Sequence, residues 1–347
     1  MFAGAYADDF FDRLDPNLAV SNGTGAGGIA DDVDNAVDVL IGADKGELHL
    51  RDRVDKQLVA AYVFLPAMLC AAAGDITQRI KKILWQPDQA FVLTSGTMAV
   101  GSDFRRFKTQ AGLEKGHRVM ESVSPSPFDY RNNCLLYLPQ IPPRQRVEDT
   151  DVYFNELTAE LVGLIKAATG HALVLFTSYA AMSAVKERLW EESLPFPLLT
   201  LGRNAPHIIE QFRHTPGAVL LATGAAWEGF DFPGDCVSLL IIPRLPFAYP
   251  DARKERELEK YPSLHAFIRE VAVPEMQIKL RQGFGRAIRT ESDTCVIAIL
   301  DERACRGRRY AQAVSEALPE MRRTGSLREV TRFLREKKPE SYFEVGR

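Results

Sequence analysis

The sequence predicts an α/β fold in which a parallel sheet is covered by helices on both faces. From Cys134 onward, short apolar runs alternate with longer amphipathic stretches. The apolar runs are continuous, which is typical of strands that are buried on both faces. We expect strands at 134–138, 172–177, 197–201, 218–222, 237–242 and 295–300, and helices at 152–168, 179–190, 205–213 and 274–289. Asp151 can cap the first helix and Ser178 the second.

The composition indicates a soluble globular protein. The 347 residues are 46% hydrophobic and 26% charged, which leaves room for one full domain and part of another. The formal net charge of −3 gives no overall basic field, so any groove for nucleic acid must be local. The densest basic cluster is Arg303, Arg306, Arg308 and Arg309, which is either a solvated turn or a phosphate contact.

The cysteines and the apolar runs point to a cytoplasmic protein without a membrane partner. None of the five cysteines forms a C-x-x-C pair, so we expect reduced and mostly buried thiols. Asp8 and Asp9 stand where a signal peptide would carry basic residues. The longest apolar run, 58–73, is interrupted by Pro66 and is shorter than the roughly 17 to 25 residues of a membrane span. It predicts a core helix.

The segment from Gln282 to Arg289 carries the most informative spacing. If a helix that starts at Pro274 runs through it, then Gln282, Arg286 and Arg289 share one face. Two guanidiniums beside an amide suit a site that grips a polyphosphate. The alternative is an ordinary amphipathic helix with solvated arginines. If Arg286 and Arg289 do grip a phosphate, Arg281 is an internal control: it points about 100° away from Gln282 on the helix, so replacing it by alanine should be mild.

Three further segments place polar residues after apolar runs. The first is a Gly-rich acidic loop, 223–235, which lies between the strands expected at 218–222 and 237–242. The second, 173–179, is a buried strand that ends in hydroxyls, and the third, 91–98, has the same form. Loops at strand ends are where α/β proteins keep their chemistry, so these segments are candidate functional sites.

Taken in order, the four segments resemble motifs III to VI of superfamily 2 helicases of the DinG/XPD-like branch. Residues 94–98 resemble motif III, 175–179 motif IV, 223–235 motif V and 282–289 motif VI. The connecting segments 126–130, 244–247 and 299–303 are also similar to DinG, and the resemblance covers about residues 58–343. It implies a second RecA-like lobe at 126–343, the end of a first lobe with a connector at 58–125, and a mostly helical remnant of an inserted domain at 1–57.

The resemblance also implies a role for each site residue. In this family ATP binds between two RecA-like lobes, and the second lobe presents its arginines to the γ-phosphate. Arg286, Arg289 and Gln282 would therefore be catalytic, and the nucleotide-binding residues would be Glu228, Gly229, Asp231 and Gly285. Single-stranded DNA would contact Thr97, Thr177, Ser178, Tyr179 and Trp227. For Trp227 a core aromatic beneath the loop is an equal alternative, because stacking needs an exposed ring face.

The family's P-loop and acidic box are missing. The sequence contains no Gly-Lys-Ser or Gly-Lys-Thr, and its one Asp-Glu pair after an apolar run, at 301–302, is downstream of the motif VI segment. We therefore expect the C-terminal part of a helicase, as a fragment, a truncated gene or one half of a split protein. ATP and Mg²⁺ would bind only together with a protein that supplies the P-loop lobe, and no cysteines here have the spacing of the relatives' iron–sulfur cluster.

Two functional classes stay open. The chain is either the C-terminal part of a DinG-type ATP-dependent DNA helicase, or a non-enzymatic module that binds single-stranded DNA or a helicase partner. A weaker third option is a nucleotide-binding oxidoreductase, because 23–28 satisfies G-x-G-x-x-G. A Gly-rich linker explains that segment better, because the preceding strand candidate is too short.

Overall fold

The computed structural model separates the chain into two compact units. Unit 1 comprises 1–93, 105–120 and 249–271, and unit 2 comprises 94–104, 121–248 and 272–347. The residues that the structure describes are 37–41, 48–52, 58–64, 68–73, 77–85, 90–113, 119–145, 150–202, 207–227, 229–232, 234–249 and 252–344. The glycine-rich segment 23–28 lies outside them.

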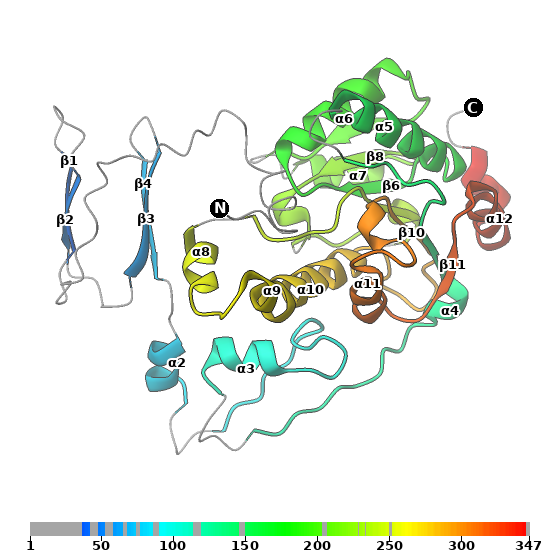
Figure 1. The fold of residues 1–347 in the computed structure, drawn as a ribbon. Coiled ribbons are helices and arrows are strands. Elements are labelled where there is room, and N and C mark those ends of the chain that lie inside the picture. Colours follow the sequence, from blue (N-terminus) through cyan, green and yellow to red (C-terminus); the bar gives the residue numbers. More distant parts are fainter. Residues whose placement is uncertain are drawn as a thin grey trace. The chain divides into compact units, whose positions relative to one another are not determined.

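Unit 2 is built on a seven-stranded parallel sheet (Figure 1). The strand order is β11-β5-β10-β9-β6-β8-β7, and every neighbouring pair is parallel. The strands are β5 (Cys134–Tyr137), β6 (Ala172–Leu175), β7 (Leu198–Thr200), β8 (Val219–Ala222), β9 (Leu239–Ile242), β10 (Cys295–Ile299) and β11 (Arg322–Thr324). The α/β fold and the six expected strands are confirmed. The sequence did not reveal β11, because two exposed arginines give it no apolar pattern.

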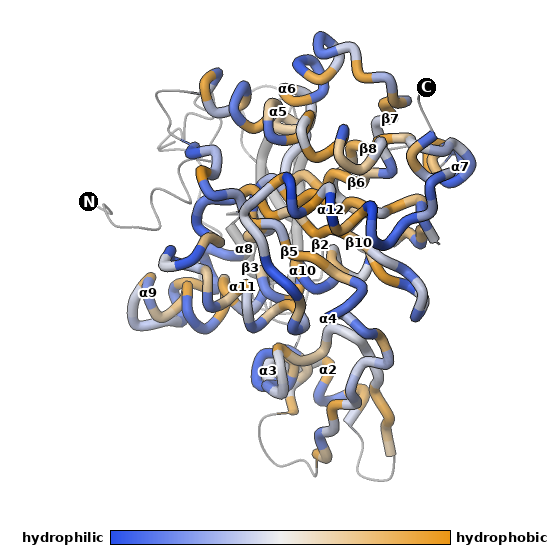
Figure 2. Tube along the Cα trace, turned by 90° about the vertical axis from the view of Figure 1, so that its right-hand side faces the viewer, coloured by the Kyte–Doolittle hydropathy of each residue, from blue (hydrophilic) through white to orange (hydrophobic). Residues whose placement is uncertain are grey.

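Alternate residues of each strand face opposite sides of this sheet. In β6, Leu173 and Leu175 belong to one core and Ala172 and Val174 to the other. The first core is covered by α7 (His207–His214), α10 (Val273–Phe284) and α11 (Ala311–Ala317). The second is covered by α5 (Thr150–Ala167), α6 (Tyr179–Glu191) and α12 (Leu327–Lys337). Figure 2 shows the hydrophobic strands between these layers.

Short helices complete unit 2, and one of the two expected helix caps is present. The short elements are α4 (Tyr130–Asn133), η2 (Gly224–Trp227), η3 (Gly234–Val237), η5 (Glu302–Ala304) and η6 (Glu340–Glu344). Ser178 caps α6 as expected, because its Oγ accepts from Ala181 N at 3.2 Å. Asp151 is not a cap. It lies in the first turn of α5, and its carboxylate accepts from Arg188 Nη2 at 2.7 Å.

The helix expected at 274–289 ends early. A π-helical turn (Ile268–Ala272) precedes α10, which stops at Phe284 with Gly285 as its C-cap. Gly285 N donates to Arg281 O at 2.9 Å, and the tighter bonds from Arg286 N to Gly283 O and from Ala287 N to Phe284 O then close the last turn. Arg286 and Arg289 are therefore beyond the helix, so the predicted shared helical face is wrong.

Unit 1 contains two antiparallel strand pairs and short helices. β1 (Val37–Ile41) pairs with β2 (Leu48–Asp52), and β3 (Leu58–Phe64) pairs with β4 (Met68–Ala73). The core helix expected at 58–73 is thus wrong. Val, Tyr and Phe favour strands, and Pro66 would interrupt a helix. The helices are α2 (Thr77–Ile83), α3 (Arg105–Ala111), α8 (Ala252–Leu258) and α9 (Leu264–Phe267).

Two other expectations concern the N-terminal third. The described parts of 1–57 are strands β1 and β2, so the described residues give no support for a mostly helical segment there. The run before Thr94 forms no strand, and Val92 is 89% exposed. An apolar run becomes a strand only beside a pairing partner, which the pattern itself cannot supply. Throughout the described residues, every helix is too short or too polar to cross a membrane.

Candidate nucleotide and nucleic-acid site

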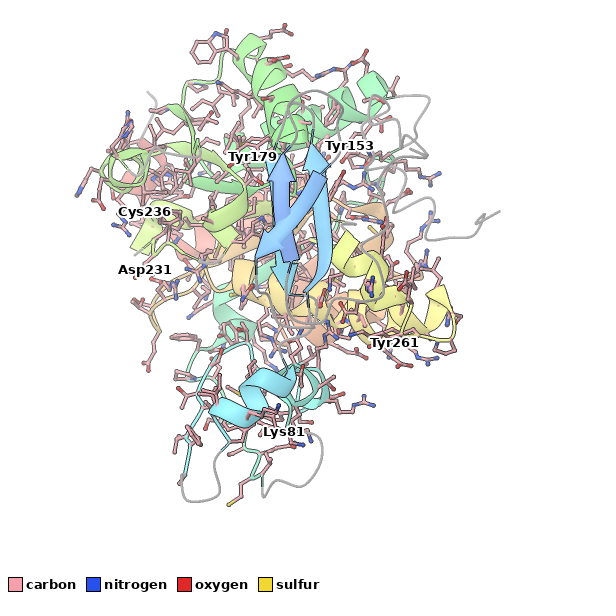
Figure 3. All side chains as sticks on the ribbon, turned by 90° about the vertical axis from the view of Figure 1, so that its left-hand side faces the viewer. Lys81, Tyr153, Tyr179, Asp231, Cys236 and Tyr261 are labelled. Carbon is pink, nitrogen blue, oxygen red and sulfur yellow. The ribbon has the colours of Figure 1, made fainter. Side chains whose placement is uncertain are left out.

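The loop after β6 presents the hydroxyls of the motif IV-like segment. Ser178 and Tyr179 are exposed and Thr177 is half-buried, because the strand ends here and α6 begins. Tyr179, labelled in Figure 3, is 39% exposed and stands in the first turn of α6. A Cβ built on Gly224 would lie 3.9 Å from its Oη, so the tyrosine lies beside the start of the motif V-like loop.

Trp227 is a core residue that joins three of the motif-like segments. Its ring is fully buried, and Nε1 donates to Phe176 O at 2.9 Å. The ring also leaves no room at Gly283, where a Cβ would be 2.7 Å from Trp227 Cζ3 and 3.3 Å from Leu175 Cδ1. A stacking contact with a base needs an exposed ring face, so the DNA-contact role predicted for Trp227 is wrong and the core alternative holds. Its neighbour Glu228 lies outside the described residues.

Arg286 and Arg289 converge on the motif V-like loop, although they are not on a helix. Arg286 Nη1 and Arg289 Nη2 both donate to the carbonyl oxygen of Phe230, the second at 3.4 Å. Arg289 Nε is also 2.6 Å from Asp231 Oδ1, in an ion pair that lacks the alignment of a hydrogen bond. Asp231 (Figure 3) is exposed, so water screens this pair. The two guanidiniums thus stand side by side at a half-buried position.

The backbone around these arginines is fixed on both sides. Asp293 Oδ2 accepts from the main-chain N–H groups of Arg289 and Thr290, at 2.7 and 2.8 Å. Gln282 is half-buried in the last turn of α10, and its carbonyl oxygen accepts from Arg286 Nε at 3.3 Å. In the facing loop, Gly229 N donates to Ala225 O at 2.9 Å. Gln282, Gly285, Gly229 and the two arginines therefore lie in one region of unit 2.

Arg281 makes two contacts that the expectation of a mild Arg281→Ala variant did not include. Its Nε donates to Ala317 O at 3.1 Å, and its Nη1 donates to Ala99 O at 2.7 Å. Burial lowers the pKa of this guanidinium. Arg281 therefore ties the motif III-like segment, which contains Thr97, to α10 and α11, and it cannot serve as a mild control. Thr97 is half-buried, and its N–H donates to Ser95 Oγ at 3.2 Å.

Asp301 is committed to the structure. Its Oδ2 accepts from Leu245 N and from Arg303 Nη2, both at 2.8 Å, and its Oδ1 accepts from Arg303 Nε at 2.9 Å. This carboxylate is buried, and both of its oxygens accept hydrogen bonds from protein groups. Within the described ranges, no group of three or more His, Cys, Asp or Glu side chains could hold a metal ion.

We expect Gly283→Ala to destabilise the protein by about 1 to 3 kcal/mol. The added methyl would collide with the Trp227 ring, and overpacking a core costs about this much. Gly163 in α5 is the control, because a Cβ there meets only Leu327 Cδ2, at 3.0 Å on a flexible side chain. Alanine favours a helix by up to about 1 kcal/mol, so Gly163→Ala should be neutral or stabilising. Urea unfolding measures both variants, and equal effects would contradict the close contact.

Comparison with known proteins identifies the class that this fold and these loops define. Residues 161–321 match the family model for a helicase C-terminal domain. Two solved XPD structures, XPD_Helicase and XPD_APO, match 74% of the chain with TM-scores of 0.54 and 0.53 and cover 46% and 52% of those chains. Because the sequence identity to both is only 16%, this similarity supports the fold and nothing further. Unit 2 is therefore a RecA-like helicase C-terminal lobe.

The curated relatives narrow this class. ATP-dependent DNA helicase YoaA of Haemophilus influenzae is 34% identical over 261 residues, 72% of this chain and 38% of the relative. ATP-dependent DNA helicase DinG of Photobacterium profundum is 30% identical over 260 residues, 72% of this chain and 37% of the relative. The chain belongs to the DinG/XPD-like superfamily 2 helicases and corresponds to their C-terminal part. It spans well under half the length of these relatives.

The structure also assigns importance to groups that sequence reasoning missed. The two arginines both donate to the Phe230 carbonyl oxygen. Every residue has such a backbone atom, so the sequence gives no indication of this role. The bond from Arg281 to Ala99 joins positions 182 residues apart, which no local pattern can report. Gly283 did carry a signal, because a glycine within a helix suggests close approach by another group.

Proposed function

We propose that this chain supplies the second RecA-like lobe of a DinG-type, ATP-dependent DNA helicase. The observation that carries the proposal is the convergence of Arg286 and Arg289 on the motif V-like loop at Phe230 and Asp231. Fixed guanidiniums at one locality suit the charge that develops on a transferred phosphoryl group. A protein that carries the P-loop would provide the facing lobe and the carboxylates for Mg²⁺, whose part is to neutralise the triphosphate.

In this proposal the chain's own residues have two tasks. Arg286 and Arg289 would stabilise negative charge at the γ-phosphate, while Gln282, Gly285, Gly229 and Asp231 hold the surrounding turns and loop. Thr177, Ser178 and Tyr179 would hold a single strand, through hydroxyl contacts to phosphates and stacking on the exposed Tyr179 ring. Trp227 connects the two regions, because its indole contacts both Phe176 and Gly283.

The isolated chain should show no appreciable ATPase activity, with or without single-stranded DNA. The sequence contains no Gly-Lys-Ser/Thr, so nothing here would cradle the β- and γ-phosphates. The measurement is steady-state phosphate release by purified protein. Turnover of order 1 s⁻¹ that DNA stimulates and that an Arg286→Ala variant lacks would contradict the expectation, because that is a normal enzyme rate.

Binding to single strands should be weak, sensitive to salt and nearly independent of sequence. Half a groove makes few phosphate contacts, and the net charge of −3 adds no general attraction. Fluorescence anisotropy with labelled oligonucleotides at several salt concentrations tests this. Nanomolar, salt-insensitive binding to one duplex sequence would instead indicate a dedicated recognition module.

The missing P-loop sequence favours a second candidate function. A chain without Gly-Lys-Ser/Thr can be a non-enzymatic module that binds single-stranded DNA or a helicase partner. The two proposals separate when the chain is combined with a protein that carries a P-loop lobe. ATPase activity that requires Arg286 supports the helicase lobe, whereas binding without any ATPase supports the module.

A further inference from the structure

We infer that the loop between β10 and α11 is a second phosphate-binding site, which extends the track of a single nucleic-acid strand beyond residues 177–179. The loop carries three exposed arginines, Arg306, Arg308 and Arg309, on a protein whose net charge is −3. This inference rests on the proposed nucleic-acid role of the motif IV-like segment.

The loop leaves the same edge of the sheet as the motif IV-like segment. β10 and β6 are both hydrogen-bonded to β9 and run parallel to it, so their carboxyl ends lie at the same edge of the sheet. Neighbouring strands lie about 4.8 Å apart, so the ends of β10 and β6 are separated by roughly 10 Å. A strand that contacts Thr177 and Tyr179 can therefore continue across β9 towards the loop that follows β10.

The base of the loop is held by buried contacts. Asp301 binds Arg303 and the backbone of the loop after β9, at Leu245. The rings of Phe247 and Tyr310 lie 4.8 Å apart, and the Arg303 guanidinium is 5.4 Å from the Phe247 ring. Burial lowers the pKa of Arg303 to about 10, which still leaves it charged at neutral pH. Tyr310 N donates to Arg303 O at 2.9 Å and closes the loop.

The tip of the loop is open and positive. Gly307 adopts φ +77, and a Cβ there would meet nothing within 4 Å. Across the described residues, no carboxylate forms an ion pair with Arg306 or Arg308, whereas Arg303 is already neutralised by Asp301. Arg309 lies 5.1 Å from the Tyr310 ring and is partly held there. A pre-formed loop with exposed guanidiniums costs little to order when a phosphate binds.

The occupant that fits this edge is a nucleic-acid strand. An acidic peptide would also satisfy the arginines, but the same edge offers the hydroxyls of Thr177 and Ser178 and the exposed ring of Tyr179. Hydroxyls that contact phosphates and an aromatic ring that stacks on bases are the features of single-strand binding sites. Phosphates at regular spacing would then bridge the hydroxyls and the arginine loop.

The test is anisotropy of a fluorescein-labelled oligo-dT at several salt concentrations. Arg306→Ala/Arg308→Ala should weaken binding about tenfold, the sum of two exposed ionic contacts. It should also reduce the slope of log K against log salt by about 1.4, because each phosphate contact on a single strand contributes about 0.7. Arg306→Lys/Arg308→Lys should keep the slope.

The control removes the same charge elsewhere. Arg332→Ala/Arg335→Ala changes two exposed arginines of α12, whose last turn leads to Lys338, a partner of Asp235 near the amino end of β9. It should leave affinity and slope unchanged. Equal losses in both double variants would mean a general charge effect and would overturn the inference, as would an arginine-loop variant that binds like the wild type.

Two further arms separate the inference from the proposed function. If Thr177→Ala/Tyr179→Ala weakens binding and the arginine-loop variant does not, the proposed DNA contact of the motif IV-like segment is supported and the inferred second phosphate site is wrong. No binding of oligo-dT by the unaltered chain at low salt would overturn both. Polyglutamate should compete much more weakly than unlabelled oligo-dT, and competition at equal charge concentration would assign the loop to an acidic protein partner.

Discussion

Replacing Arg286 or Arg289 by alanine should abolish most of the ATPase activity when the chain is joined to a lobe that carries a P-loop. Arginine fingers in phosphoryl-transfer sites are worth about 10³ to 10⁵ in rate. The rate should fall far more than ATP affinity, because these guanidiniums act on charge that develops in the transition state while the P-loop holds the ground state. The measurement is steady-state ATPase beside nucleotide affinity.

The control for this prediction is Arg332→Ala, an exposed arginine of α12 whose loss should change neither quantity. Arg281→Ala is a test of a different kind, because this residue holds Ala99 and Ala317. We expect it to lower stability as well as rate. If Arg286→Ala and Arg289→Ala mainly destabilise the fold, or weaken ATP binding as much as they slow turnover, the assignment of the motif VI-like segment is wrong.

The Phe230 carbonyl oxygen orients both arginines. Arg286 and Arg289 both donate to that carbonyl oxygen, so each guanidinium is oriented before a phosphate arrives. Pre-orientation reduces the reorganisation that accompanies charge stabilisation. Asp231→Asn should therefore disturb the orientation of Arg289, because Arg289 Nε is 2.6 Å from that carboxylate.

The sheet could be predicted from the sequence because its strands are short apolar runs. β6, β8, β9 and β10 are buried on both faces, so each is a continuous apolar run that the sequence identifies as a strand. Ser178, a residue type that often caps helices, marks the start of α6. β11 could not be predicted, because an edge strand with two exposed arginines has the same polar sequence pattern as a loop. The apolar run at 58–73 led to the wrong prediction of a helix, because the length of an apolar run does not distinguish a helix from a β-hairpin.

The geometry of the candidate site could not be predicted from the sequence. The spacing of Gln282, Arg286 and Arg289 matched a helical face, yet the helix ends at Gly285, and a turn brings the arginines to Phe230 instead. Trp227 shows the same limit. Residue type allowed a core or a stacking role. The complete burial of the ring decides between them, and it depends on tertiary contacts such as the one with Gly283, 56 positions away.

Gly170→Ala should destabilise the protein by more than about 3 kcal/mol, the largest effect we expect from a single methyl group. Gly170 stands between α5 and β6 with φ +77, and a Cβ there would lie 1.9 Å from Gly217 O and 2.6 Å from Gly217 C. The Gly217 backbone cannot easily retreat. Its N–H donates to His171 Nε2 at 3.2 Å, and the next residue, Ala218, accepts from Ala172 N at 3.2 Å.

The expected effect of Gly170→Ala has two causes, the left-handed backbone and the collision with Gly217. Gly307→Ala separates them. Gly307 has the same φ of +77, but a Cβ there meets nothing within 4 Å, so alanine should cost only the left-handed backbone penalty of about 1 to 2 kcal/mol. The difference between the variants in urea unfolding, followed by circular dichroism, measures the collision with Gly217. Equal free energies of unfolding would mean that the chain relaxes at this crossing and that the close approach at the entry to β6 does not constrain the sheet.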